Sequence, residues 1–503
     1  MIRWPLVAAD LPQALRGPSN DAPACSRFAD PERRARCEAS VLGASHSPMD
    51  MGRPDYGTPS RGGRHAHGPA TPIDRLTGPA GTPQRTVTLT AATGQQVIGG
   101  IEQPVLTFNG TTPGPTLVLQ QGELVEVRLR NTNVAQGVTI HWHGVDVPGR
   151  EDGVAGVTQD AVLPGGQYVY RFVVPDAGTY WYHTHQDSVR SVARGLLGAL
   201  VVLPTSAPPT ADPVPVDVTG LVHTYGPITT INGAAGSTAV AMLDGASARV
   251  RMINSDNGPR LVSASVPFRV VAIDGTDVVG GAELSDTFVE LPAGGRADLL
   301  VPVAAVGTRV GILGGPSLAL GPAGVDPPPV TARVRFDALT YGTPGDAQRA
   351  RAALGPVTVR FDYRVDRRPG FLNGRFGDWY TINGRMIPDV PMFMVRLGDV
   401  VLVRVSNRTP LVHPMHLHGH HALVVARNGV PASGAPWWVD SLEVDPRESY
   451  DLLFVADNPG VWMFHCHNLP HARAGLMTHL MYEGVSTPYR IGQVSRQLAN
   501  QPE

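Results

Sequence analysis

Four short stretches of the chain place histidines two residues apart or beside a rare cysteine. They read HWHG (141–144), HTH (183–185), HPMHLHGHH (413–421) and HCHNLPH (465–471). Imidazole is a good ligand for copper, zinc, iron and nickel, so the histidines alone do not choose the metal. Residues i and i+2 of a β-strand point to the same face, and each His-x-His pair therefore presents two imidazoles side by side. We interpret the four stretches as parts of a metal site.

Cys466 lies between His465 and His467, and strand alternation turns its thiolate to the face opposite both imidazoles. One strand should therefore serve two metal sites. A cysteine with two histidines in a trigonal arrangement, and a weak or missing axial ligand, is typical of a blue-copper electron-transfer site. His413 and His471 are available to complete such a site. With His420 and His421 interpreted as ordinary core or surface residues, eight histidines are left for the second one.

The sequence around these clusters belongs to a pattern that recurs three times along the chain. The turn-like stretches FNGTTPGPTL (108–117), TINGAAGST (230–238) and TINGRMIPDVP (381–391) are each followed by an alternating stretch: GELVEVRLRN (122–131), DGASARVRMIN (244–254) and GDVVLVRVSN (398–407). Alternation over five to eight residues between Gly, Pro and Asn turns predicts half-buried antiparallel strands. We expect an all-β chain with one β-sandwich per copy, and all four histidine clusters in the first and third copies.

Composition shifts predict the domain boundaries. Residues 1–84 are rich in Pro, Gly, Ser and Arg and are expected to form an irregular extension. Proline-rich segments at 204–215 and around 341–356 are expected to link the sandwiches. The predicted domains are 85–205, 213–340 and 356–485, with a tail at 486–503.

Length and charge restrict the kinds of partner. A chain of 503 residues is too long for one core and fits about three domains of roughly 150 residues. The formal net charge is -2 and the two signs are interspersed, which argues against a nucleic-acid partner or a charged membrane surface. No run approaches 18 apolar residues, so we expect no membrane span. A small molecule or an ion is the expected substrate.

Together, the four clusters resemble the copper motifs of the multicopper oxidases, the laccase-like family, over about residues 85–485. The resemblance implies three consecutive cupredoxin-like Greek-key β-sandwiches and four copper ions. It implies a type 1 copper on His413, Cys466 and His471, and a trinuclear cluster between the first and third domains. His141 and His416 would hold the type 2 copper. The type 3 pair would be held by His143, His183, His185, His418, His465 and His467. The implied reaction couples four one-electron oxidations of a donor to reduction of O2 to water.

Oxygen reduction consumes protons, so an acid near the cluster would be useful. Asp152, in EDG (151–153), matches the acidic residue that family members place beside the cluster, and we expect it to act in catalysis together with Cys466. The alternative is an acidic turn residue before Gly153. Several bacterial relatives carry a second carboxylate directly after the last type 1 histidine, where this chain has Ala472. Either Asp152 and water suffice, or another acid such as Asp440 reaches in.

The axial position of the type 1 site is a second departure from many bacterial relatives. Where they have Gly-Met-Met, this chain has Gly475-Leu476-Met477, and motif alignment places Leu476 nearest the copper. Leucine has no donor atom, and loss of an axial thioether favours Cu(I). We therefore predict that Leu476 is an axial non-ligand, that the type 1 site has a relatively high potential, and that Met477 packs in the core.

Family substrates include phenols, aromatic amines and lower-valent metal ions, which the sequence separates poorly. No Met-rich insert appears between 360 and 485, which favours a laccase-like oxidase of small phenolic or aromatic amine donors with O2 as acceptor. A Cu(I) or Mn(II) oxidase for copper resistance is one alternative, and a non-catalytic copper-binding scaffold is another. We expect a monomer, because one chain contains both cluster-bearing domains.

The location is expected to be extracytoplasmic, meaning secreted, periplasmic or on the cell surface, although no export signal is visible in this sequence. Cys25 and Cys37 could close a small disulfide loop, which would suit an oxidising compartment. Two free thiols are the alternative.

Overall fold

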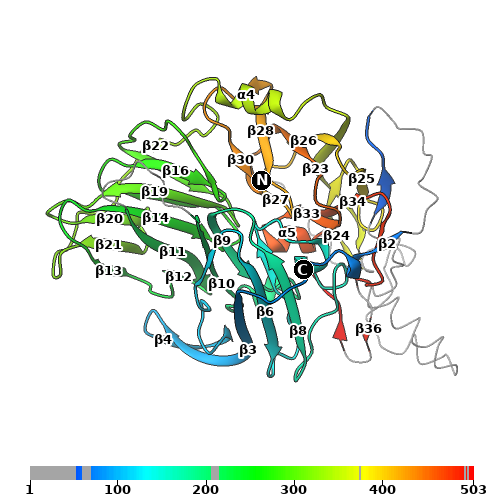
Figure 1. Cartoon of the computed structure of the whole chain (residues 1–503), viewed down its shortest axis with the longest axis horizontal. Coiled ribbons are helices and arrows are strands. Elements are labelled where there is room, and N and C mark those ends of the chain that lie inside the picture. The colour runs from blue at the N-terminus through cyan, green and yellow to red at the C-terminus, as the bar shows by residue number, and fades with distance from the viewer. Residues whose placement is uncertain (1–51, 59–69, 206–214, 373–374, 492–493, 496–497) are drawn as a thin grey trace, which may run out of the picture.

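The structure is a computed structural model that describes residues 52–58, 70–205, 215–372, 375–491, 494–495 and 498–503. Three β-sandwiches follow one another along the chain, as predicted. In Figure 1 the first is cyan and blue at the bottom, the second is green at the left, and the third is yellow to red at the upper right.

The first sandwich consists of two four-stranded sheets. One has the order β5 (Leu117–Gln120), β10 (Leu197–Leu203), β9 (Gly178–His183) and β7 (His141–His143). The other has the order β4 (Ile101–Phe108), β3 (Arg85–Ile98), β6 (Leu124–Asn131) and β8 (Gln167–Val173). The alternating sequence of β6 buries Val125, Val127 and Leu129 against the facing sheet, so apolar burial orients each strand.

The second sandwich has two six-stranded sheets. The first has the order β12 (Ile228–Ile231), β11 (Val216–Tyr225), β14 (Ser247–Asn254), β19 (Arg296–Pro302), β16 (Arg269–Ile273) and β17 (Thr276–Asp277). The second has the order β13 (Ser237–Ala241), β21 (Ser317–Gly321), β20 (Thr308–Ile312), β15 (Arg260–Ala264), β18 (Thr287–Leu291) and β22 (Val334–Arg335). β19 begins at Arg296, whose buried guanidinium points toward the third sandwich.

The third sandwich contains the strands that carry the third and fourth histidine clusters, the fourth of which includes Cys466. Its six-stranded sheet has the order β1 (Arg53–Asp55), β25 (Pro391–Val395), β34 (Met477–Tyr482), β33 (Val461–Cys466), β27 (His413–Leu417) and β31 (Ser441–Val444). Its seven-stranded sheet has the order β24 (Arg375–Ile382), β23 (Val359–Leu372), β26 (Val400–Asn407), β32 (Ser449–Val455), β28 (Ala422–Arg427) and β29 (Val430–Pro431), and β30 (Trp438–Val439) pairs with β28. Adjacent β27 and β33 bring the third and fourth clusters together.

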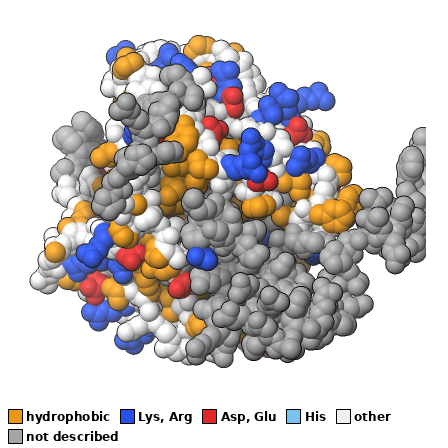
Figure 2. Space-filling view, turned by 90° about the vertical axis from the view of Figure 1, so that its right-hand side faces the viewer, with side chains coloured by type: hydrophobic (Ala, Val, Ile, Leu, Met, Phe, Trp, Pro, Cys, Tyr) orange, Lys and Arg blue, Asp and Glu red, His pale blue; other side chains and the backbone are white. Residues whose placement is uncertain are grey.

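Helices are short and few among the described residues. They are η3 (Ile73–Arg75), η4 (Gly149–Asp152), α3 (Ser188–Ser191), α4 (Asp346–Ala353) and α5 (Leu469–Arg473). None of them has the length and apolar character needed to cross a bilayer. On the face drawn in Figure 2, arginines lie among hydrophobic side chains in the upper half, with fewer acidic side chains between them.

The N-terminal extension differs from the irregular segment that was predicted, since parts of it pair with the third domain. β1 runs parallel to β25 at the edge of the six-stranded sheet, and β2 (Thr71–Pro72) pairs with β35 (Val485–Ser486). Strands of two or three residues are too short to show a period, while an edge strand offers unpaired backbone groups to any segment that reaches it. Near the other end, β36 (Val494–Ser495) pairs with β37 (Leu498–Ala499). Cys25 and Cys37 lie outside the described residues.

Candidate metal centres

The structure brings Cys466 together with His413 and His471. The Cys466 Sγ atom lies 3.7 Å from Nδ1 of each histidine, and the two Nδ1 atoms are 3.2 Å apart. All three ligand atoms lie within 4.8 Å of one another. Burial raises the pKa of the Cys466 thiol, whereas burial and neighbouring cations lower the pKa of His413 to about 3 and of His471 to about 4. One thiol and two neutral imidazoles fit a single soft metal ion such as copper.

Leu476 and Met477 point to opposite faces of the sheet. Met477 is paired with His465 across β33 and β34, and paired residues of antiparallel strands share a face. Leu476, one residue earlier, should therefore share the face of Cys466, whose backbone N–H donates to the Leu476 carbonyl at 3.0 Å. Both side chains are buried in the third-domain core. The placement fits an apolar residue beside the thiol.

Apart from His420 and His421, the remaining eight histidines of the motifs converge between the first and third sandwiches. Each sandwich supplies four of them, and every one is 2 % exposed or less. Their nitrogens form compact groups: His141, His143 and His416; His143, His183 and His467; His185, His418 and His465. β7 and β9 position the first-sandwich members, while β27, β33 and the residues just after them position the others. The structure thus brings together every histidine that the sequence assigned to the second site.

Hydrogen bonds decide which nitrogen of each imidazole faces this centre. In six histidines Nδ1 lies 2.8–3.2 Å from an oxygen acceptor, which frees Nε2: His141, His183, His185, His416, His418 and His465. His143 is reversed, because its Nε2 lies 3.0 Å from the Ser441 hydroxyl. Among the described residues, its Nδ1 has no hydrogen-bond partner, nor does Nε2 of His183, His185 or His467. Buried nitrogens left unbonded in this way fit metal ligation.

The same burial keeps the imidazoles neutral. For six of the eight, loss of hydration and the neighbouring histidines hold the pKa well below its usual range: His143, His183, His185, His418, His465 and His467. A neutral imidazole offers a lone pair, as a metal requires. The nitrogens of His418 and His465 lie only 3.1 Å apart, and those of His141 and His416 lie 3.4 Å apart. Such close approach of lone pairs is favourable when a cation lies among them.

Asp152 lies against the centre at the end of η4. One carboxylate oxygen is 3.0 Å from Nδ1 of His418, and the other is 3.1 Å from Nδ1 of His141. The turn depends on Gly153, which has φ of +76° and lies so close to the Ile140 carbonyl that a Cβ would be 1.8 Å from its oxygen. Asp152 is therefore held where it can orient ligands from both sandwiches.

Asp440 and its partners also contact the centre, a role predicted from the sequence only as an alternative to Asp152 and water. An Asp440 oxygen lies 3.2 Å from Nε2 of His143, and the carboxylate accepts two bonds of 2.6 Å from the Arg296 guanidinium. Burial alone would raise the pKa of Asp440, but Arg296 and the neighbouring histidines hold it well below its usual range. Arg296 comes from the second sandwich, which has no histidine cluster, so sequence motifs could not reveal it.

Glu503 is a further acid that the motifs missed. It lies 3.2 Å from Nδ1 of His465 and 3.9 Å from Nε2 of His185, and it accepts a bond of 2.6 Å from the Ser188 hydroxyl. Burial raises its pKa to about 8. Ala472 is buried in α5, and the adjacent Arg473 acts electrostatically on Glu503. An acid from the predicted tail therefore contacts the eight-histidine centre, whereas Ala472 itself offers no carboxylate.

Two regions of the chain match sequence profiles described as multicopper oxidase, at residues 90–207 and 360–484. Multicopper oxidase MmcO of Mycobacterium tuberculosis is 30% identical over 458 residues, which are 79% of this chain and 87% of the relative. The chain belongs to the multicopper oxidase family. The family implies copper as the cofactor, and the thiol-imidazole group and the unbonded histidine nitrogens fit it.

More distant relatives of this multicopper oxidase have different names. Laccase-1 of Botryotinia fuckeliana is 25% identical, with 75% of this chain and 78% of the relative covered. The iron transport multicopper oxidase fetC of Epichloe festucae is 26% identical, with coverages of 75% and 73%. The crystal structure of a multicopper oxidase from Pseudomonas thermotolerans superposes with a TM-score of 0.64 at 25% identity, covering 80% of this chain and all of that one. The fold of cupredoxin-like sandwiches is therefore shared with the family.

Proposed function

We propose that this multicopper oxidase is a laccase-like enzyme that oxidises small phenolic or aromatic amine donors and reduces O2 to water. The observation that carries the proposal is that β33 serves both centres. Cys466 lies on one face of the strand, His465 lies on the other face, and His467 follows directly after the strand ends. When bound, copper would supply one-electron redox chemistry at the Cys466 group and the reduction of oxygen at the eight-histidine group. Adjacent residues of one strand then form a short path for electrons.

Differences in burial support the division of roles. The eight histidines are buried, whereas His471 is only partly buried and can meet a donor from solvent. An electron that the donor gives up at His471 would pass through Cys466 to the eight-histidine centre. The donor therefore does not need to enter the centre where oxygen is reduced. Asp152, between the two sandwiches, is proposed to orient His418 and to supply protons for water formation.

The surroundings of His471 favour an aromatic donor over a metal cation. The Tyr380 ring lies 5.0 Å from the His471 ring and 5.2 Å from the His413 ring, and the Arg367 guanidinium lies 5.2 Å from the Tyr380 ring. Arg367 is also paired with Asp378 at 3.2 Å, but its charge lowers the pKa of both histidines and would act against a metal cation at the same place. The same β23–β24 hairpin carries Phe371 and Phe376, which are 48% and 67% exposed and offer aromatic contacts.

The test is oxygen uptake by the copper-loaded protein with phenols, aromatic amines, Cu(I), Fe(II) and Mn(II), with the blue absorbance recorded in parallel. We expect turnover with phenols and amines, and weak turnover with the metal ions. Turnover with metal ions alone would instead make the protein a metal-ion oxidase, a possibility that the name of the fungal relative fetC keeps open. Copper binding without oxygen uptake from any donor would leave only a copper-binding scaffold.

We also propose that the protein is a monomer and acts outside the cytoplasm. Both halves of the eight-histidine centre come from one chain, so a second copy is not needed to complete it. Gel filtration with light scattering of the copper-loaded protein tests the oligomeric state, and fractionation of the native host tests the location.

A further inference from the structure

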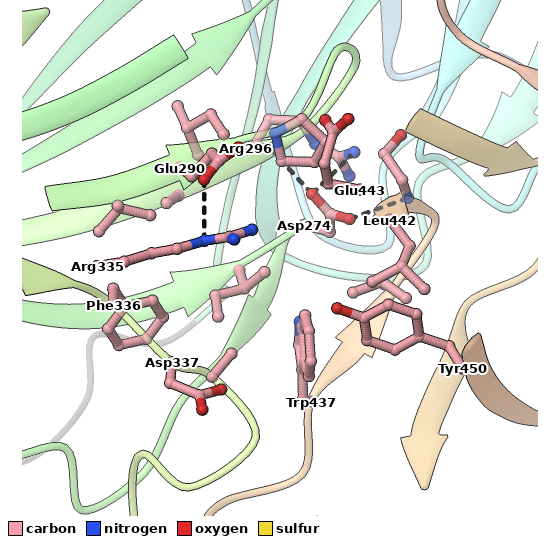
Figure 3. A pocket seen from close by; sticks show the side chains of 18 of the residues that line it. Asp274, Glu290, Arg296, Arg335, Phe336, Asp337, Trp437, Leu442, Glu443 and Tyr450 are labelled. Atoms are coloured by element: carbon pink, nitrogen blue, oxygen red, sulfur yellow. Dashed lines mark hydrogen bonds and ion pairs between the residues drawn. The ribbon is translucent and has the colours of Figure 1, made fainter. Parts of the chain in front are cut away.

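A cavity of about 80 Å³ lies between the second and third sandwiches. Asp274, Glu290 and Arg296 line it from the second sandwich, and Ser441 and Glu443 line it from the third (Figure 3). One water molecule needs roughly 10–15 Å³ of such space, so the cavity has room for several. It joins a domain without histidine clusters to strand β31, which borders the eight-histidine centre.

Glu443 is an unusual residue in this cavity, because it is only 6% exposed and yet unpaired. Within the described part of the chain, neither of its carboxylate oxygens has a hydrogen-bond partner, and the Nε1–H of Trp437 on the same wall also has none. Buried polar groups are almost always hydrogen-bonded. Three unbonded polar atoms around one cavity therefore indicate a polar occupant, for which water is the simplest choice.

The charges that face Glu443 favour its protonated form. Burial raises the pKa of Glu443 to about 8, with further upward contributions from Glu290, Asp445 and Glu448, while Arg335 acts in the opposite direction. A carboxyl group with a raised pKa keeps its proton at pH 7 and loses it as the pH rises through about 8. At neutral pH the cavity therefore contains a neutral acid that can give up a proton.

Strand geometry connects this acid to the eight-histidine centre. Ser441 and Glu443 are two residues apart on β31, so their side chains share one face of the sheet. Across the antiparallel ladder they pair with His416 and Pro414 of β27. The Ser441 hydroxyl lies 3.0 Å from Nε2 of His143 and 3.3 Å from Nδ1 of His416. One end of the cavity is therefore a hydroxyl group in contact with two histidines of the centre.

The opposite end of the cavity approaches solvent. Its wall there includes Arg335 and Asp337, whose side chains are 47% and 39% exposed. In Figure 3 Arg335 and Asp337 lie below and to the left of the Asp274, Arg296 and Glu443 group, and Trp437 lies below it. The cavity thus extends from partly exposed charged side chains to Ser441.

We propose that Glu443 and the water in this cavity form a second proton supply to the oxygen-reducing centre, in addition to Asp152. The Glu443 carboxyl group gives its proton to cavity water, the proton moves along the water to the Ser441 end, and solvent at the mouth restores the acid. No electron takes this route, and the overall reaction is unchanged: O2, four electrons and four protons give two water molecules. This inference depends on the proposed oxidase function.

The first experiment compares Glu443→Gln with a matched control, Glu483→Gln, which changes another largely buried glutamate of the third sandwich that pairs with Arg396 outside the cavity. Stopped-flow absorbance separates reduction of the blue centre by a phenol without oxygen from reoxidation by O2. For Glu443→Gln we expect normal reduction, reoxidation slowed by about tenfold or more, and loss of the rate dependence on pH near 8. Glu483→Gln should keep the wild-type reoxidation rate, and Glu443→Asp should recover part of it.

The second experiment observes the proton directly, by infrared difference spectroscopy of the metal-free protein. We expect the protonated-carboxyl absorption that is lost as the pH rises through about 8 to be smaller by one carboxyl group in Glu443→Gln, the remainder coming from Glu503, whose pKa is also about 8. Wild-type reoxidation in Glu443→Gln, or an unchanged carboxyl band, would overturn the proton route while leaving the oxidase function intact. Failure of the wild-type protein to consume oxygen with any donor would overturn both, and the two failures are therefore distinguishable.

Discussion

At the residue scale, the hydrogen bonds to the histidines decide what each ring can offer a metal. Six of the eight rings turn Nε2 toward the centre because Nδ1 is already bonded, and His143 turns Nδ1 because Ser441 and Asp440 bond its Nε2. A bonded second nitrogen fixes both the tautomer and the orientation of a ligating imidazole. The centre is therefore arranged before any ion enters.

Leu476 is expected to set the potential of the Cys466 group. Leu476→Met would place a thioether on the thiol face and stabilise Cu(II), lowering the reduction potential by about 60–120 mV, since 59 mV corresponds to a tenfold change for one electron. Redox titration of the blue absorbance measures this shift. The control is Met477→Leu, on the other face, which should leave the potential unchanged. An unshifted potential in Leu476→Met would rule out the axial assignment.

Cys466 is expected to be needed by one centre only. In Cys466→Ser the blue absorbance should disappear and the copper content should fall by one ion per chain. The eight histidines keep their ion-binding nitrogens, because the thiol is not among them. Copper analysis together with electron paramagnetic resonance tests this. Loss of all the copper would show that the two centres do not load separately.

At the element scale, the short turn from η4 into Gly153 positions Asp152. Its backbone must pass against the Ile140 carbonyl while adopting a positive φ, and only glycine satisfies both conditions. The same turn also holds the Asp152 carbonyl 3.0 Å from Nδ1 of His141. A three-residue motif in the sequence thus fixes two contacts to the centre.

Gly153→Ala should therefore cost more than an ordinary glycine substitution. We expect a loss of about 3 kcal/mol or more in unfolding free energy, together with weaker copper retention, because the new Cβ meets the Ile140 oxygen. Gly165→Ala is the matched control, since it has a similar φ of +81° but no atom within 4 Å of the added Cβ. Thermal unfolding of both variants tests this prediction. Equal losses of unfolding free energy in the two variants would contradict the steric explanation.

Local alternation explains why much of the architecture could be predicted. The period of two residues put Cys466 and its flanking histidines on opposite faces, and the repeated strands indicated three sandwiches. Other contacts arise only when distant segments pack, as with Arg296 of the second sandwich, Glu503, and the Glu443 cavity. No local pattern marks such residues. The strands β1 and β2 were missed because two or three residues show no period.

At the scale of the whole molecule, the second sandwich supports the centre through a buried ion pair. Arg296 bonds Asp440 of the third sandwich with both nitrogens, and it also donates to the Thr179 carbonyl of the first. One guanidinium therefore contacts all three domains. Breaking a buried pair leaves an uncompensated charge.

Arg296→Met should thus destabilise the protein by about 3–5 kcal/mol and weaken copper binding by the eight-histidine centre. Thermal unfolding and copper retention after dialysis measure the two effects. Arg404→Met is the control, because it breaks an exposed pair with Asp451, and such surface pairs contribute little. If Arg296→Met behaved like the control, the ion pair would not hold the domains together.

The eight-histidine centre draws four histidines from each of two sandwiches that are separated in sequence by a third. In terms of mass action, the intervening sandwich is a tether that raises the effective concentration of one half-site for the other. Formation of the centre is then an intramolecular step. Copper uptake per chain should not change on dilution, whereas separately expressed first and third sandwiches would have to find each other at a rate set by their concentrations.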